Sequence, residues 1–292
     1  MTTPLPNLTE HETKRSTMVV DGTELLIEGE GTHTVVMLHG WPDTQRLWDN
    51  TVQALSPSLR CVRFTLPGFG AQQAGPAIRL DGMTQHLLAI LDAVSPDQPV
   101  TLLLHDWGCI FGYELAMRHP QRVARLIGVD IGDHNMPAYL RSLSAGKKMA
   151  ILLYQLLLAQ AWVLGRYVNQ ALANGISRWM ARAMRCPTPA DQIGWQMNYP
   201  YAMAWFKLGG GLPTRQVVPK CPMLYLYGKR KPFMFHSPEW LQTLQSKPGS
   251  AAHGLATGHW LMVEQPQVFN DLVLTWLQEA TAATRQSIPQ TV

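Results

Sequence analysis

Short apolar runs alternate with longer amphipathic stretches along most of this chain, and this alternation constrains the fold more than any other feature. The run VVMLHG precedes LWDNTVQAL, LRCVRFTL precedes MTQHLLAILDAV, VTLLLHD precedes CIFGYELAMRH, and VARLIGVDIG follows. Short uninterrupted apolar runs are typical of strands buried on both faces, and the stretches between them have helical spacing. The pattern predicts an α/β protein whose mostly parallel sheet is covered by helices on both faces.

The alternation stops after Asp133 and resumes at residue 215. Residues 134–214 are rich in Met, Leu, Ala, Trp and Tyr and have no strand-like run. The pattern then continues with CPMLYLYG, two helical stretches and a short run between them. We therefore expect residues 1–133 and 215–292 to form two parts of one core, with a helical cap at 134–214. Near the start, two weakly alternating runs flank Asp21-Gly22, which predicts a hairpin.

Composition excludes several classes of protein. Only 15% of residues are charged, and the net charge of +4 forms no basic stripe interleaved with aromatic residues. We therefore expect no nucleic-acid partner. The four cysteines have no metal-ligand spacing, which favours a reduced, cytoplasmic protein over a disulfide framework.

The chain has no pattern typical of a signal peptide or a membrane span. Residues 1–15 are polar and contain prolines, without the apolar core of a signal peptide. The most apolar stretch is Met149–Gly165, which polar side chains interrupt and which is slightly short for a span. We expect a buried or lid helix there and no transmembrane segment, with peripheral membrane contact as the alternative.

Three predicted strand ends carry unusual residues. They read His39-Gly40-Trp41-Pro42-Asp43, His105-Asp106-Trp107-Gly108 and Gly258-His259-Trp260. Ligands of open α/β sheets bind beyond the carboxyl ends of the strands. The middle segment has the layout of a nucleophile elbow, with Asp106 where serine is usual and a small residue, Gly108, two positions later. Leu104, two positions earlier, is larger than the usual pattern allows.

HGWP, HDWG and GHW, the last followed by Glu264 and Pro266, resemble α/β-hydrolases with an aspartate nucleophile. Epoxide hydrolases and haloalkane dehalogenases are the main members, and the resemblance spans roughly residues 16–280. It implies that Asp106 forms an alkyl ester and that His259 activates the water that hydrolyses it. It also implies that the backbone N–H groups of Trp107 and Trp41 stabilise the oxyanion. This chemistry needs no metal and no organic cofactor.

Each of these residues also has a simpler interpretation. Asp106 could cap the helix that follows it, and His259 could be a histidine in a turn. We interpret His39 and His105 as structural residues beside functional ones. Cys109 is expected to be a small buried residue at the start of a helix.

The sequence offers several acids that could orient His259. Many relatives place it in a G-x-x-D pattern, but this chain reads Gly228-Lys229-Arg230-Lys231. Some haloalkane dehalogenases place it after the preceding core strand, where this chain has Asp130. We favour Asp130, with Asp133 nearby as an alternative and Glu239 as a weaker one because it is expected within a helix.

Two features bear on the substrate. In epoxide hydrolases, lid tyrosines donate hydrogen bonds to the epoxide oxygen. The resemblance assigns these roles to Tyr154 and Tyr201, with Tyr199 as the alternative to Tyr201. Each tyrosine could instead serve only in packing. Haloalkane dehalogenases often have asparagine directly after His-Gly, and Trp41 at this position is more like epoxide hydrolases. An acid at Asp130, in contrast, is more like haloalkane dehalogenases.

We favour a hydrolase that opens a small apolar epoxide to a diol. The alternatives are a haloalkane dehalogenase or a related β-lactone decarboxylase. A ligand-binding protein on a hydrolase scaffold is an alternative from another class, and Lys231 at the usual acid position favours it.

Overall fold

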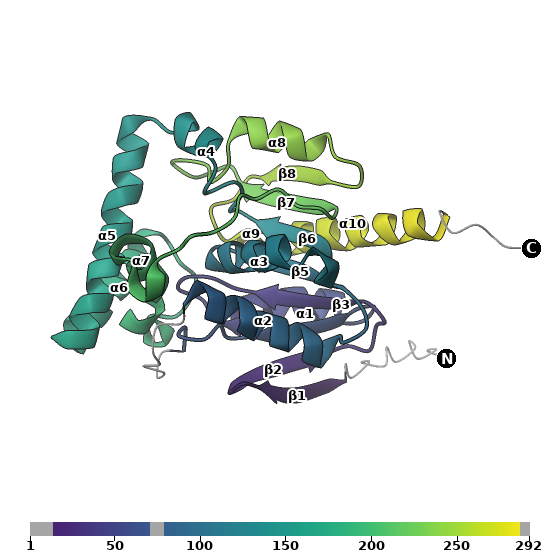
Figure 1. The fold of residues 1–292 in the computed structure, drawn as a ribbon, viewed down its shortest axis with the longest axis horizontal. Helices are drawn as coiled ribbons and strands as arrows, with labels where there is room; N and C mark the ends of the chain where they lie inside the picture. Colours follow the sequence, from purple (N-terminus) through teal and green to yellow (C-terminus); the bar gives the residue numbers. More distant parts are fainter. Residues whose placement is uncertain (1–13, 71–78, 287–292) are drawn as a thin grey trace, which may run out of the picture.

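The computed structural model describes residues 14–70 and 79–286. The first thirteen residues, about which the sequence made a prediction, lie outside the described residues. The described strands form one eight-stranded sheet in the order β1-β2-β4-β3-β5-β6-β7-β8 (Figure 1). Their bounds are β1 Arg15–Val20, β2 Thr23–Glu28, β3 Thr34–Leu38, β4 Arg60–Phe64, β5 Val100–His105, β6 Val123–Val129, β7 Met223–Gly228 and β8 Ala251–Leu255.

Strands β3 to β8 pair in parallel, whereas β1 pairs with β2 and β2 with β4 in antiparallel fashion. The hairpin between β1 and β2 turns at Asp21 and Gly22, both with positive φ, as a two-residue turn of this kind requires. The α/β architecture predicted from the sequence is therefore confirmed.

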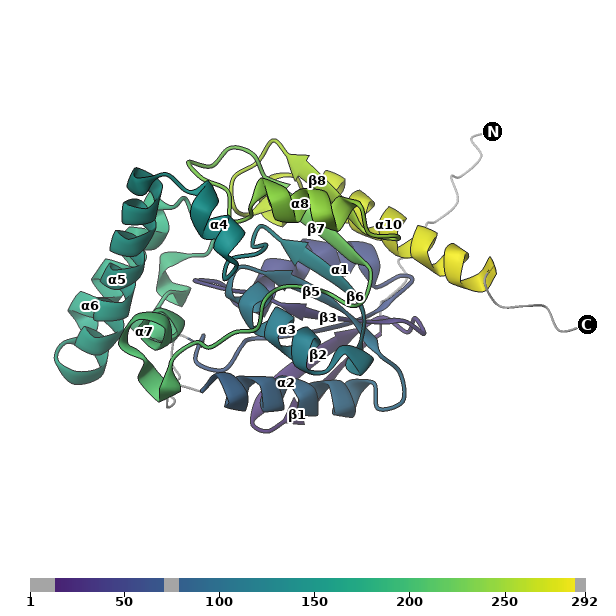
Figure 2. The ribbon, with the colours of Figure 1, turned by 45° about the horizontal axis from the view of Figure 1, so that its top comes forward.

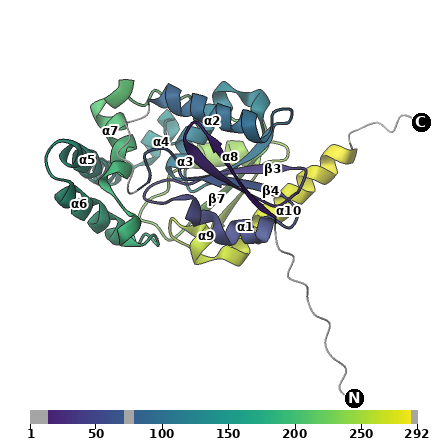
Figure 3. The ribbon, with the colours of Figure 1, turned by 90° about the horizontal axis from the view of Figure 1, so that it is seen from below.

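Helices cover both faces of the sheet because each buried strand presents apolar side chains to both. Val36 and Leu38 of β3 pack in the core that contains α2 and α3, whereas Val35 and Met37 pack with α1, α9 and α10. Figure 3 shows these two groups of helices on opposite sides of the sheet. The helices of the core are α1 Asp49–Leu55, α2 Leu80–Val94, α3 Trp107–Arg118, α8 Pro238–Gln245, α9 Leu261–Glu264 and α10 Pro266–Gln286.

The segment between β6 and β7, which we call the helical insertion (residues 134–214), contains helices and no strand; all of its residues are described. It lies at the end of the molecule opposite α10 (Figure 1), and α4 is its part nearest the sheet (Figure 2). Its α-helices are α4 Pro137–Ser142, α5 Ala145–Tyr167, α6 Gln170–Ala183 and α7 Tyr199–Phe206, and the 3-10 helix η4 Trp195–Asn198 precedes α7.

Candidate active site

Asp106 lies in the sharp turn between β5 and α3. Its φ of 51° and ψ of −120° are rare for a residue with a side chain, and such strain is concentrated at functional sites. The turn is tight because a Cβ on Gly108 would come within 2.4 Å of the Leu38 carbonyl oxygen. The Asp106 side chain makes no capping hydrogen bond to α3. The helix-cap interpretation therefore does not describe this residue.

The bulky Leu104 is accommodated one turn into α3. A Cβ on Gly112 would lie 2.4 Å from the Leu104 side chain, so glycine there makes room for it. Gly112 in the helix after Asp106 thus provides the space that a small residue at position 104 would otherwise provide.

His259 faces Asp106 from the loop after β8. Its Nε2 lies 3.4 Å from Oδ2 of Asp106, and its Nδ1 is hydrogen-bonded to Oδ2 of Asp130. His105, fully buried, supports this loop because its Nε2 lies 3.1 Å from the His259 carbonyl oxygen. The structure therefore brings together Asp106, His259 and Asp130 with the imidazole between the two carboxyl groups, which is the arrangement of a catalytic triad.

Asp130 follows β6 and is completely buried. Its Oδ1 accepts hydrogen bonds from the Gly228 backbone N–H at 3.0 Å and from the Lys231 ammonium at 2.5 Å. Lys231 thus occupies the usual acid position and binds the acid that comes from the neighbouring strand. The cation does not displace the acid from His259.

The two other candidate acids lie elsewhere. Asp133 accepts hydrogen bonds from the backbone N–H of Ser237 at 2.7 Å and from its hydroxyl at 2.6 Å, which fixes the start of α8. Glu239 is in the first turn of α8, with its side chain 75% exposed and 3.9 Å from Arg141. Neither is paired with His259.

Charges around His259 set its protonation. Burial lowers the pKa of His259, but Asp130 and Asp106 outweigh that effect and raise it to about 9. Burial raises the pKa of Asp106, but the hydrogen bond and charge of His259 bring it below its usual value. The pKa of Asp130 is likewise lowered despite burial, mainly by the charges of Lys231 and His259. At neutral pH the site therefore holds two carboxylates with an imidazolium between them.

Oδ1 of Asp106 occupies the position expected for an oxyanion. It accepts a 2.7 Å hydrogen bond from the backbone N–H of Trp41. A Cβ on Gly40 would lie 2.4 Å from both this oxygen and the Trp107 backbone nitrogen, so only glycine permits the approach. Trp41 donates as the resemblance implies. The Trp107 N–H, for which the resemblance implies the same role, makes no hydrogen bond to this oxygen.

Two tyrosines of the helical insertion come together above the two tryptophans. The Tyr201 ring centroid lies 5.0 Å from that of Trp107, 5.9 Å from Trp41 and 6.3 Å from Tyr154, each pair in an edge-to-face arrangement. Burial, together with the charge of Asp106, raises the pKa of both tyrosines, for Tyr201 well above 10. Both hydroxyls therefore stay protonated and can donate.

Tyr199, the fallback candidate, lies in a different environment. Its ring stacks on Phe111 and meets the edge of Phe69, with centroids 6.5 and 5.6 Å apart. It packs between the insertion and the core and has no ring contact with Trp41 or Trp107 among the described residues.

The sequence analysis missed a buried polar connection between Trp41 and the insertion. The indole N–H of Trp41 donates to the side-chain oxygen of Asn198 at 2.7 Å, and the Asn198 amide donates to the Ser177 hydroxyl at 2.7 Å. Asn198 and Ser177 are fully buried. Asparagine in an apolar segment was the available signal, but its partner lies 157 positions away.

A second missed residue is Asp43, at the end of the HGWPD segment. It accepts hydrogen bonds from the Trp260 indole N–H at 3.0 Å and from the Thr188 hydroxyl at 2.5 Å. Burial raises the pKa of Asp43 to about 6. This carboxyl group ties the loop that carries His259 to the insertion.

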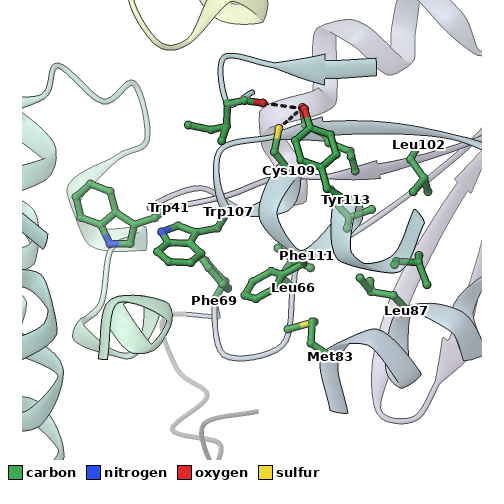
Figure 4. Close-up of a cluster of buried hydrophobic side chains, with 14 of the residues drawn as sticks. Trp41, Leu66, Phe69, Met83, Leu87, Leu102, Trp107, Cys109, Phe111 and Tyr113 are labelled. Atoms are coloured by element: carbon green, nitrogen blue, oxygen red, sulfur yellow. Dashed lines mark hydrogen bonds between the residues drawn. The ribbon is translucent and has the colours of Figure 1, made fainter. Parts of the chain in front are cut away.

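His39 and Cys109, which the sequence analysis interpreted as structural residues, are both buried in the core. His39 accepts a 2.9 Å hydrogen bond from the Leu66 backbone N–H, which joins the loops after β3 and β4. Cys109 is fully buried beside Tyr113 (Figure 4), and burial raises the pKa of its thiol to about 12. Within 14–70 and 79–286, no group of three or more His, Cys, Asp and Glu side chains could hold a metal ion.

Residues 33–265 match the alpha/beta hydrolase fold family, and the chain belongs to this family. It is 20% identical to the epoxide hydrolase of Bacillus megaterium, whose inhibitor complex has been solved by crystallography. That structure superposes with a TM-score of 0.66 over 90% of this chain and all of that one. This likeness concerns the fold.

Curated relatives match shorter segments. A cis-3-alkyl-4-alkyloxetan-2-one decarboxylase of Shewanella oneidensis is 32% identical over 42% of this chain and 41% of its own length. A haloalkane dehalogenase of Mesorhizobium japonicum is 37% identical over 39% of this chain and 37% of its own length. The chain thus spans about two fifths of the length of these relatives.

Proposed function

We propose that this chain is a cofactor-independent hydrolase that opens small apolar epoxides to diols through an ester on Asp106. The observation that carries the proposal is the meeting of Tyr154 and Tyr201 over the tryptophans beside Asp106. Two protonated hydroxyls at this position suit a substrate whose leaving oxygen stays attached and becomes an alkoxide.

In the first step Oδ2 of Asp106, the oxygen that does not accept from the Trp41 N–H, attacks an epoxide carbon. The new carbon–oxygen bond replaces the ring bond, and the alkoxide takes a proton from Tyr154 or Tyr201. The product is a hydroxyalkyl ester of Asp106, which carries no charge.

In the second step a water molecule attacks the ester carbonyl carbon of Asp106. Loss of the Asp106 charge removes one of the two carboxylates that raise the pKa of His259, and the tyrosinate recovers its proton from the imidazolium, which leaves a neutral imidazole as the base. The Trp41 N–H stabilises the oxyanion on Oδ1, a contribution of about 3 kcal/mol for a typical donor. His259 takes a proton from the attacking water and gives it to the departing diol oxygen as the tetrahedral intermediate collapses. The proton that remains on the Asp106 carboxyl group returns to His259, which restores the starting state.

The Trp41 side chain also favours an epoxide over a halide. Its indole N–H already donates to Asn198, a partner that an outgoing halide would have to displace. The helical insertion supplies both tyrosines and Asn198, and we propose that it is the cap that closes over the substrate. Its apolar composition is the basis for expecting an apolar substrate.

A haloalkane dehalogenase is the second candidate. The acid that reaches His259 comes from the end of β6, as the dehalogenase resemblance implies, and Asp106 could displace a halide by the same attack. An oxetanone ring is a third type of substrate for the same residues. These candidates differ in what remains on Asp106 after the first step.

Intact-mass measurement of the His259→Gln variant tests the proposal. Without the base, the ester should form and persist after incubation with a mixed panel of epoxides and chloro- and bromoalkanes. An adduct with the full mass of an epoxide supports the proposal. An alkyl adduct without its halogen would make the chain a dehalogenase, and no adduct from any epoxide would refute the proposal. The Asp106→Asn variant is the matched control and should form no adduct.

A further inference from the structure

The outer surface of the helical insertion is apolar. Exposed on α5 are Met149, Leu153, Val163 and Tyr167, which with Gln160 recur at intervals of three, four or seven residues and so form one stripe. Leu172 and Trp179 of α6, spaced seven apart, are 56% and 55% exposed. Figures 1 and 2 show α5 and α6 side by side at the end of the molecule. Exposed apolar area of this kind marks an interaction site.

Helix α5 faces two environments. The sequence predicted a buried or lid helix, but only five of the 23 residues of α5 are buried. Only one face of the helix is therefore buried. Tyr154 on the inner side meets Tyr201, whereas its neighbour Leu153 is 60% exposed. By length and composition α5 could cross a membrane, yet its inner face packs on the rest of the insertion. Such a helix can lie in the plane of a bilayer surface.

The charges of this region have one sign. Residues 134–190 contain seven Lys and Arg and no Asp or Glu, whereas the rest of the chain has 17 basic and 20 acidic residues. Lys147 and Lys148 lie at the start of α5 and Arg166 near its end, and Arg182 and Arg185 follow the exposed stripe of α6. These five side chains are exposed. Basic residues that flank an apolar stripe are suited to lipid phosphates.

We propose that this surface, the outer stripes of α5 and α6 with their flanking basic residues, docks onto an anionic lipid bilayer. The apolar stripes would enter the interface while the basic side chains reach the headgroups. The charge argues against a second copy of the chain as the occupant, because two such faces would bring like charges together. This inference rests on the exposed surface alone and does not depend on the proposed reaction.

Vesicle flotation of the full chain tests the inference. We expect weak binding to phosphatidylcholine vesicles, stronger binding when phosphatidylglycerol is added, and loss of the increment at high salt. Replacing Leu153, Leu172 and Trp179 together by serine should reduce binding at least tenfold on both kinds of vesicle. Val19→Ser, at a residue of edge strand β1 that is 68% exposed, is the matched control and should bind like the unaltered chain.

Charge reversal tests the contribution of the basic side chains to membrane binding. Lys147→Glu with Lys148→Glu should weaken binding to phosphatidylglycerol vesicles by about 20-fold or more, since each basic residue near the surface contributes about fivefold. Arg15→Glu on β1 is the control. No preference for anionic vesicles, or equal losses in the controls, would overturn the inference. So would a serine variant that turns a dimer of the unaltered chain into monomers, since a second copy would then cover this face.

Discussion

Nζ of Lys231 lies 2.5 Å from Oδ1 of Asp130, and their side chains are 7% and 0% exposed. The position after β7 that carries the acid in many relatives here carries a cation, and the acid comes from the end of β6. Because parallel strands β6 and β7 are neighbours, both positions reach the same point beside His259. The departure from the common pattern is therefore compensated locally.

Loss of Lys231 should destabilise the fold. Lys231→Met leaves the buried Asp130 carboxylate with Gly228 and His259 as the remaining partners of its side chain in the described part of the chain, and breaking one side of a buried ion pair costs about 3 kcal/mol. Urea unfolding at neutral pH measures the change. Lys229→Met, at an exposed neighbour, is the control and should change stability by less than about 0.5 kcal/mol. Equal stability of the two variants would show that the ion pair contributes nothing.

Stability should fall as the pH rises from about 6.5 to about 9. The pKa of His259 is raised to about 9 in the folded chain, against about 6.5 when unfolded, so the folded state binds the proton more tightly. The resulting stabilisation, on the order of 3 kcal/mol, is complete below pH 6.5 and is lost as the pH passes the folded pKa.

Denaturant melts across this pH range check that expectation. His259→Gln should remove the slope. Asp106→Asn should lower the pKa of His259 in the folded chain, because it removes one of the two carboxylates that hold the proton on His259. The loss of stability should then be complete at a lower pH. A slope that survives in His259→Gln would assign the effect to another group.

The two tyrosines should share the donation to the leaving oxygen. Tyr154→Phe and Tyr201→Phe should each slow ester formation, and the double variant should lose about 10² to 10⁴ in rate, the usual range for general acid catalysis. Single-turnover mass spectrometry on an epoxide substrate gives the rates. Tyr199→Phe is the control and should leave the rate unchanged, because this hydroxyl has no hydrogen-bond partner among residues 14–70 and 79–286. A double variant as fast as this control would remove the tyrosines from the mechanism.

Asn198 should matter for stability and for catalysis. Asn198→Leu leaves the Trp41 indole N–H and the Ser177 hydroxyl without this buried partner, at a cost of about 1–3 kcal/mol. Because Trp41 also donates its backbone N–H to Asp106, we expect the rate of ester hydrolysis to fall as well. Thermal unfolding and turnover measure the two effects. Ser177→Ala, which keeps the Trp41 contact, should affect stability but spare turnover.

The sequence predicted what depends on local patterns. The β1–β2 hairpin follows from Asp21-Gly22 and its flanking runs, and the elbow at Asp106 follows from a buried strand ending beside Gly108. These two features depend on residues close together in the chain. The choice of Asp130 rests instead on the resemblance to haloalkane dehalogenases, and its bond to His259, 129 positions away, agrees with that choice.

Long-range polar contacts could not be predicted in this way. Asp43 contacts Thr188 and Trp260, which lie 145 and 217 positions away, and only the folded arrangement of insertion and core brings them together. The exposure of the outer face of α5 could not be predicted from the sequence either. A predominantly apolar helix is expected to be buried, whereas here the insertion covers only the inner face of α5.

Attack by Asp106 is the central claim, and the fate of a labelled oxygen tests it most directly. The enzyme, in excess over an epoxide substrate, would be allowed one turnover in water enriched in oxygen-18. The account predicts an unlabelled diol and a label in the peptide that contains Asp106, because water attacks the ester carbonyl carbon. Label in the diol after the first turnover would show that water attacks the epoxide itself, and would contradict the account.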